Sequence, residues 1–368
     1  MAKSYNVIQW GTGYTGLHAL KYILWNRHLN VVGLKCYTEA KEGHDAGVLA
    51  GCAPIGIKAT RDTDALLALK ADCVIYMPRD PLGDPTEPDS PSEAWVTELV
   101  RILESGHNVV TSIASGTHHR QLRHGEEFRR RLNDACVKGG SSLLFTGFDP
   151  GFSDVLAYSM SGAVGGISGI RTWEICDYSA YPVTETLSHM GYGTRPEDLP
   201  DGAMNVVRAT WGGVPYLLGE ALGVEVEDIR IDADFYLSPK TFTAPGGLLV
   251  KEGTIGALRF SIHGIVDGKP MLSVNHVTRI GQDMAPDWPA IGRDGGYRVE
   301  IDAYPPFFGE FPMGLPGGTG TTFEDAMAMT AARCVNCVEP VVKAEPGYRS
   351  VLELPLLGGW YAVGTRSA

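Results

Sequence analysis

Short apolar runs alternate with amphipathic stretches from Tyr5 to about Phe152. The runs have the length of buried strands, and the stretches between them place apolar residues at helical spacing. The predicted strands cover residues 7–10, 31–36, 73–77, 109–113 and 143–146. The predicted helices cover residues 17–26, 62–70, 95–105 and 125–138. This alternation predicts an α/β domain of the Rossmann type, with a doubly wound parallel sheet.

After Gly151 the apolar runs become longer, and they predict strands at 170–178, 228–238, 254–266, 269–280 and 295–303. Asp267-Gly268 lies between two of these runs and is a strong hairpin signal, so at least part of the second sheet is expected to be antiparallel. Residues 322–343 predict a last helix. We therefore expect a Rossmann domain over 1–150, an α+β domain with a mixed, largely antiparallel sheet over 151–320, and a helix and tail over 321–368 that pack back on the first domain.

The formal charge of −12 over 368 residues argues against nucleic acid or an anionic membrane as a partner, because both are bound through excess Lys and Arg. No apolar run is long enough to span a bilayer, and the N-terminus lacks the apolar segment of a signal peptide. We expect a cytoplasmic protein with a small-molecule substrate.

The seven cysteines are odd in number and scattered, which argues against a disulfide framework, and Cys334 and Cys337 are expected to be packed thiols.

Gly11, Gly13 and Gly16 form the pattern G-x-G-x-x-G between a predicted strand and a predicted helix. Gly11 would permit the tight turn, Gly13 the close approach of a pyrophosphate, and Gly16 the close packing of helix on strand. The free N–H groups of the first helical turn would then face the phosphates. The pattern predicts a dinucleotide site rather than a structural turn.

The end of the second strand indicates which nucleotide is bound. Cys36 occupies the position where an acidic residue would hydrogen-bond the ribose of NAD, and Tyr37, Thr38 and Lys41 follow. Lys41 could attract a 2′-phosphate. Glu39, a few residues beyond the strand end, could instead bind the ribose hydroxyl of NAD. We expect NADP, with NAD as the alternative. The proline-rich stretch 78–91 after the third strand is either a lid or a surface insertion.

GTGYTG at the start, GLKCYTEAKEGHDAG after it and TGFDPGFSDVL at the domain junction resemble the dihydrodipicolinate reductase-like oxidoreductases, in particular 2,4-diaminopentanoate dehydrogenase and the native amine dehydrogenases. The resemblance implies a homodimer, an active-site cleft between the two domains, and hydride exchange between a nicotinamide and an amine, imine or carbonyl carbon. It also implies that Phe148, Asp149, Pro150 and Phe152 lie near the nicotinamide.

One departure from the family pattern concerns proton transfer. The related dehydrogenases carry a glutamate pair where this chain reads Ala114-Ser115-Gly116-Thr117, so no carboxylate is expected there. His118 and His119 could supply a base, but we interpret them as solvent-facing residues at a helix start.

The second domain offers Asp177, Tyr178 and His276 as catalytic candidates. A tyrosine hydroxyl at a strand end can donate to a carbonyl oxygen, and a histidine can relay the proton. His276 lies on an otherwise apolar strand face, so a satisfied buried histidine is the competing interpretation, as an ordinary strand-end tyrosine is for Tyr178.

We therefore expect an NAD(P)-dependent oxidoreductase acting on a small or medium apolar amine, imine or carbonyl compound. The alternative is a catalytically impaired NADP-binding protein with a sensor or assembly role. The expected cofactor contacts are Gly11, Thr12, Gly13, Tyr14, Thr15, Gly16, Tyr37, Thr38, Lys41, Met77, Pro78, Ser115, Phe148 and Pro150.

Overall fold

The computed structural model describes residues 3–79, 92–113, 116–199, 201–292, 295–313, 322–355, 358–359 and 362. The described chain forms two compact units. The first unit contains the described residues before 153 together with those from 327 onward, and the second contains the described residues between 153 and 326. The predicted lid or insertion lies outside the described residues, apart from Pro78 and Arg79.

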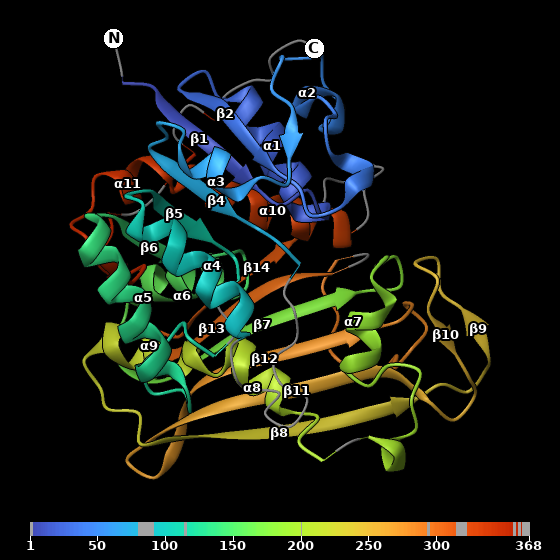
Figure 1. The fold of residues 1–368 in the computed structure, drawn as a ribbon. Coiled ribbons are helices and arrows are strands. Elements are labelled where there is room, and N and C mark those ends of the chain that lie inside the picture. Colours follow the sequence, from blue (N-terminus) through green and yellow to red (C-terminus); the bar gives the residue numbers. More distant parts are fainter. Residues whose placement is uncertain are drawn as a thin grey trace. The chain divides into compact units, whose positions relative to one another are not determined.

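The first unit is built on a seven-stranded, fully parallel sheet in the order β15-β6-β5-β4-β1-β2-β3 (Figure 1). Its strands are β1 (Tyr5–Trp10), β2 (Leu29–Lys35), β3 (Ala59–Thr60), β4 (Cys73–Tyr76), β5 (Asn108–Thr111), β6 (Ser142–Phe145) and β15 (Gly347–Arg349). Its helices are α1 (Tyr14–Trp25), η1 (Glu39–Lys41), α2 (Ala46–Leu49), α3 (Thr63–Leu67), α4 (Glu93–Glu104), α5 (Gly125–Gly139), α10 (Thr322–Asn336, from 327 onward in this unit) and α11 (Val338–Val342). The run β6-β5-β4-β1-β2-β3 has the order of a dinucleotide-binding sheet, so the Rossmann prediction is confirmed.

The apolar spacing of the sequence explains how the helices attach to this sheet. In α1 the buried residues are Gly16, Ala19, Leu20 and Ile23, one face of a helix with a period of 3.6. Residues of α10 and α11, among them Cys334 and Val338, share a core cluster with β1.

The prediction of a single helix over 322–343 was wrong in one respect: the segment divides at Cys337 into the helices α10 and α11. Pro340 lies in the first turn of α11 and has no N–H to donate to the preceding turn, which accounts for the division.

The second unit contains a six-stranded mixed sheet in the order β14-β13-β7-β12-β11-β8. Its strands are β7 (Gly165–Asp177), β8 (Asp228–Leu237), β11 (Ile255–Val266), β12 (Lys269–Arg279), β13 (Gly295–Tyr304) and β14 (Phe307–Pro312), and β9 (Phe242–Thr243) pairs separately with β10 (Leu249–Val250). Strands β7 and β12 are parallel, and the other pairs of the large sheet are antiparallel. Asp267 and Gly268 both have positive φ, +49° and +71°, as a two-residue hairpin turn requires, so the predicted hairpin is confirmed.

One face of this sheet carries the main apolar core of the unit, which includes Val274 on β12 and Leu258 on β11. The helices of the unit are α6 (Phe152–Ser161), α7 (Thr184–His189), η2 (Pro196–Asp198), α8 (Asn205–Trp211) and α9 (Gly213–Leu222). Val214 and Leu218 of α9 belong to that core, and Trp211 of α8 packs against it, so these two helices cover the core face (Figure 1).

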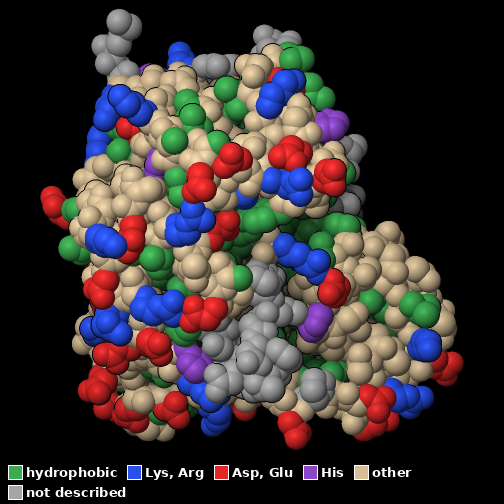
Figure 2. All heavy atoms as spheres, viewed as in Figure 1, with side chains coloured by type: hydrophobic (Ala, Val, Ile, Leu, Met, Phe, Trp, Pro, Cys, Tyr) green, Lys and Arg blue, Asp and Glu red, His purple; other side chains and the backbone are tan. Residues whose placement is uncertain are grey.

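No helix of the described residues is long and apolar enough to cross a bilayer. On the face drawn in Figure 2, Lys and Arg side chains are interspersed with Asp and Glu. The basic patch that nucleic-acid binding would require is therefore not seen on that face.

Candidate active site

The glycine motif forms a tight turn between β1 and α1. Gly11 has φ of +105°, and a Cβ there would lie 2.3 Å from the Met77 carbonyl oxygen. A Cβ on Gly16 would lie 2.4 Å from the Gly11 carbonyl oxygen. Both positions therefore require glycine to let β1, α1 and the chain after β4 approach one another. This turn brings the predicted residues Met77 and Pro78 against the motif.

Gly13 differs from the other two glycines, because a Cβ there would meet no heavy atom within 4 Å. Gly13 is the N-cap of α1, makes no side-chain capping bond, and is followed by a first turn that contains no acidic residue. The open space therefore lies at a helix N-terminus, where the helix dipole attracts anions. These features fit a bound diphosphate.

The stretch after β2 lies beside the same turn. The Lys41 ammonium donates to the carbonyl oxygen of Thr12, 2.5 Å away, so its positive charge lies at the glycine motif. Cys36 is fully buried at the position where an acid was considered. The Tyr37 hydroxyl accepts from Trp10 Nε1 at 3.0 Å and donates to the Glu98 carboxylate at 2.6 Å, which fixes its ring at the strand end.

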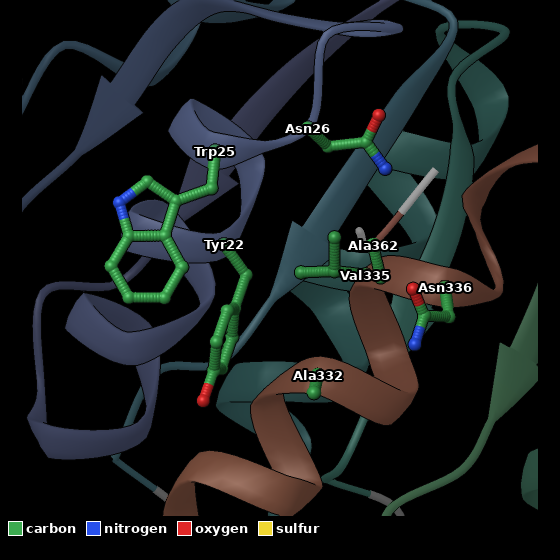
Figure 3. A pocket seen from close by; sticks show the side chains of 7 residues that line it. All are labelled: Tyr22, Trp25, Asn26, Ala332, Val335, Asn336 and Ala362. Atoms are coloured by element: carbon green, nitrogen blue, oxygen red, sulfur yellow. The ribbon is translucent and has the colours of Figure 1, made fainter. Parts of the chain in front are cut away.

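A cavity of about 450 Å³ lies at the other end of α1, and Figure 3 shows the side chains that line it. Its lining residues are Tyr22, Trp25, Asn26, Ala332, Val335, Asn336 and Ala362. Twelve residues of helix, about 18 Å at 1.5 Å per residue, separate the start of α1 from its end at Trp25. The cavity is therefore not the place where the glycine motif would hold a nucleotide.

The loop after β6, residues 146–152, is closed on itself. Phe152 donates its N–H to the Gly147 carbonyl oxygen at 3.0 Å, and Gly151, with φ of +137°, passes so close to Gly147 that a Cβ would lie 2.5 Å from the Gly147 nitrogen. The rings of Phe148 and Phe152 have centroids 5.3 Å apart. The predicted contacts Phe148 and Pro150 thus belong to one compact loop of the first unit. Ser115, also a predicted contact, lies outside the described residues.

In the second unit, three strands align a row of polar side chains on the core face of the sheet. Glu174 on β7 is the register partner of His276 on β12 and of Tyr297 on β13. All three residues are buried, with exposed fractions of 5%, 1% and 4%. A carboxylate in such a place is retained only when it is hydrogen-bonded.

Two tyrosines supply those hydrogen bonds. The Tyr178 hydroxyl donates to Glu174 Oε1 at 2.5 Å, and the Tyr297 hydroxyl donates to Oε2 at 2.7 Å. His276 Nδ1 lies 3.6 Å from Oε1. A carboxylate offers about four lone-pair positions, so Glu174 can accept several hydrogen bonds at once.

Aromatic rings fix the orientation of His276. Its imidazole stacks on the Phe260 ring, with centroids 4.6 Å apart and planes 12° apart, and the Trp211 ring lies 4.4 Å away. The histidine is therefore rigid beside the carboxylate.

The structure separates the two neighbouring candidates Asp177 and Tyr178. Burial, and then the charge of Glu174, raise the pKa of Tyr178 well above its usual value, so its hydroxyl stays protonated and its only hydrogen points to Glu174. Asp177 Oδ1 accepts the N–H groups of Ser179 and Gly281 at 2.7 and 3.1 Å, which ties β7 to the turn after β12. Tyr178 is therefore hydrogen-bonded to the buried Glu174 carboxylate, whereas the Asp177 carboxylate binds backbone N–H groups.

Glu174 itself was missed. The signal was present in TWEICDY, because a glutamate in the middle of an apolar strand is unusual unless the structure pairs it. Asp177 and Tyr178 were favoured because they lie at the end of the predicted strand. The partners of Glu174, Tyr297 and His276, are more than 100 residues away along the chain, and only the strand register aligns them with it.

The interpretation of His119 as a solvent-facing residue was wrong, His118 is half-buried, and neither residue lies at a helix start. His119 is buried, at 5% exposure, and α5 begins only at Gly125. Burial, with the charges of Arg129 and Arg120 as smaller causes, lowers the pKa of His119 to about 4. The imidazole is therefore neutral and weakly basic near pH 7, which argues against it as the general base.

We expect His119 to make the protein sensitive to mild acid. Because its folded pKa of about 4 lies below the unfolded value of about 6.5, the unfolded state binds the proton first, and stability falls as the pH drops from about 6.5 to about 4. The loss should reach about 2–3 kcal/mol. His119→Asn, which keeps an acceptor for the Gln121 N–H, should flatten this part of the curve of unfolding free energy against pH. Identical slopes for the two proteins would contradict the assignment.

Comparison with known proteins is decisive for the family. Residues 152–364 match the model of the 2,4-diaminopentanoate dehydrogenase C-terminal domain. An amine dehydrogenase of Streptomyces virginiae is 33% identical over 358 residues, which cover 95% of this chain and 96% of that protein. The chain belongs to the family of 2,4-diaminopentanoate dehydrogenase and the amine dehydrogenases. It is therefore an oxidoreductase, as the sequence resemblance indicated.

More distant relatives agree with the assignment. A 2,4-diaminopentanoate dehydrogenase of Acetoanaerobium sticklandii is 23% identical over 267 residues, 69% of this chain and 68% of that protein. The solved structure of an amine dehydrogenase from Mycobacterium smegmatis superposes with a TM-score of 0.71 at 18% identity, covering 96% of this chain and 97% of the other. The latter similarity supports the fold of the family.

Proposed function

We propose that this chain is a nicotinamide-dependent dehydrogenase that interconverts a small or medium apolar amine with its imine or carbonyl counterpart, and that Glu174 handles the substrate proton. The observation that carries the proposal is the buried Glu174 carboxylate, held by two tyrosine hydroxyls beside His276. An amine or iminium needs an adjacent anion to stabilise its charge and accept its proton, and Glu174 is suited to that task.

Different segments of the first unit would bind different parts of the cofactor. The N–H groups at the start of α1 would take the diphosphate above Gly13, and Lys41 would place its charge beside the ribose phosphate. The 146–152 loop would face the nicotinamide ring. A nicotinamide held there accepts or donates hydride at its C4 position.

The residues of the second unit would prepare the carboxylate for proton transfer. Tyr178 and Tyr297 donate to the two oxygens of Glu174, which fixes the orientation of the carboxylate. In amine oxidation Glu174 would accept a proton from the substrate nitrogen, and in imine reduction it would return that proton. His276, immobilised between aromatic rings, would stabilise the negative charge or accept the proton in turn.

The direct test is consumption of NADPH or NADH with a panel of apolar ketones and aldehydes, with and without ammonia. We expect turnover to require ammonia, because the carboxylate stabilises a cationic iminium. Turnover that is independent of ammonia would favour a carbonyl reductase. Nucleotide binding without turnover on any amine, ketone or aldehyde would favour the alternative of a catalytically impaired sensor or assembly protein.

We also propose NADP as the preferred nucleotide, on the strength of the Lys41 charge beside the glycine motif and of the neutral Cys36 at the end of β2. Lys41→Ala should weaken NADPH by about tenfold, the scale of one charge-assisted contact, and leave NADH almost unchanged. The measurement is fluorescence titration of both nucleotides, with Lys70→Ala as a control for net charge. Equal or tighter binding of NADH by the wild type would refute the preference.

A further inference from the structure

One face of α10 touches both loops that the proposed function assigns to the cofactor. The residues concerned are Met327, Thr330, Arg333 and Cys334. Thr330 follows Met327 by three residues, and Arg333 and Cys334 follow Thr330 by three and four, so all of them lie toward the same side of the helix. All of them belong to the first unit, although they follow the second unit in the sequence.

Three of these residues hold the 146–152 loop. Thr330 Oγ1 accepts the Phe148 N–H at 3.3 Å, and Cys334 Sγ donates to the Thr146 carbonyl oxygen at 3.1 Å. Arg333 Nε donates to Thr146 Oγ1 at 3.3 Å, and its guanidinium lies 5.6 Å from the centre of the Phe152 ring. A loop already closed on itself is thereby attached to the helix along its length.

The fourth residue contacts the glycine motif. Met327 Sδ accepts the Thr15 hydroxyl at 3.3 Å, and Thr15 lies in the first turn of α1. Along a helix the step from Met327 to Thr330 is about 4.5 Å, at 1.5 Å per residue. α10 therefore links the turn that would hold the diphosphate to the loop that would face the nicotinamide.

We propose that α10 is a cofactor-positioning element, in which Thr330 sets the nicotinamide-facing loop and Met327 sets the phosphate-binding turn. The inference rests on the proposed cofactor site and adds positioning residues to it. If it is correct, substitutions at the two positions should affect different parts of the same nucleotide.

The test uses the full-length protein and two ligands, NADPH and 2′-phospho-ADP-ribose, which lacks only the nicotinamide. Thr330→Val keeps the size of the side chain but removes the acceptor of the Phe148 N–H. It should weaken NADPH by about tenfold, the scale of one hydrogen bond, without changing the affinity for 2′-phospho-ADP-ribose, and Thr330→Ser should restore NADPH binding. Met327→Leu should weaken both ligands to the same degree, because it acts at the phosphate end.

Thr210→Val is the matched control, because Thr210 is also a helical threonine but its hydroxyl bonds within its own helix, to the Val206 carbonyl oxygen. It should leave both dissociation constants unchanged. Thermal unfolding of each variant separates a positioning role from a merely structural one. A Thr330→Val protein that loses stability but binds both ligands normally, or that loses affinity for both equally, would overturn the inference. Failure of the wild type to bind NADPH, NADH or 2′-phospho-ADP-ribose would refute the proposed function itself, whereas binding of NADH alone would refute only the NADP preference, and the test would then use NADH and ADP-ribose.

Discussion

Glu174→Gln should lower kcat/KM for amine oxidation by about 10²–10⁴-fold, the usual contribution of a positioned general base. The amide keeps the size of the side chain and can still accept a hydrogen bond from a tyrosine hydroxyl, but it has no charge to stabilise an iminium and cannot accept the proton. The amide oxygen can accept one of the two tyrosine hydroxyls and the amide NH2 can donate to the oxygen of the other, so the variant should fold. The measurement is steady-state amine oxidation, followed by the appearance of the reduced nucleotide.

Glu300→Gln is the control for this variant. Glu300 lies on β13, three residues from Tyr297, so its side chain points to the opposite face of the sheet, where it pairs with Arg171 at 2.8 Å. It should retain full activity. A Glu174→Gln enzyme with unchanged turnover would show that the carboxylate is only a structural partner of the tyrosines.

Gly13→Val should abolish measurable nucleotide binding while leaving a folded protein. A branched side chain would occupy the space in which the diphosphate must approach the start of α1, and the absence of any heavy atom within 4 Å of the Cβ position means that the apo protein has room for it. The measurement is fluorescence titration with NADPH and NADH, together with circular dichroism and thermal unfolding.

Gly11→Ala provides the contrast, since its Cβ would lie 2.3 Å from the Met77 carbonyl oxygen at a φ of +105°. It should destabilise the protein by several kcal/mol, because both a clash and an unfavourable backbone conformation must be accommodated. Normal affinity in Gly13→Val would mean that the motif does not hold the nucleotide.

The strands and helices of the first unit could be predicted because their signals are local. A strand such as β4 reads as an apolar run, and a helix such as α4 buries Trp95, Leu99 and Ile102 at helical spacing. β15 was missed because three residues after Pro346 carry no strand pattern of their own and depend on pairing with β6. β14 was missed for a similar reason, since prolines flank its short run at the edge of the sheet.

The candidate site was predictable only in part. The glycine motif defines a turn within six residues, and the structure places Met77 and Lys41 beside it. The carboxylate at Glu174 could not be assigned in the same way, because its importance lies in its neighbours on β12 and β13. Strand register over long sequence separations depends on the whole sheet, and a single sequence does not reveal it.

A crystal structure of the protein with an oxidised nicotinamide nucleotide and a primary amine tests the central claim most directly. The proposal predicts the amine nitrogen within about 3 Å of a Glu174 carboxylate oxygen, with the adjacent carbon within about 3.5 Å of the nicotinamide C4. An amine nitrogen bound by a different acid or base, out of hydrogen-bond reach of both Glu174 oxygens, would contradict it.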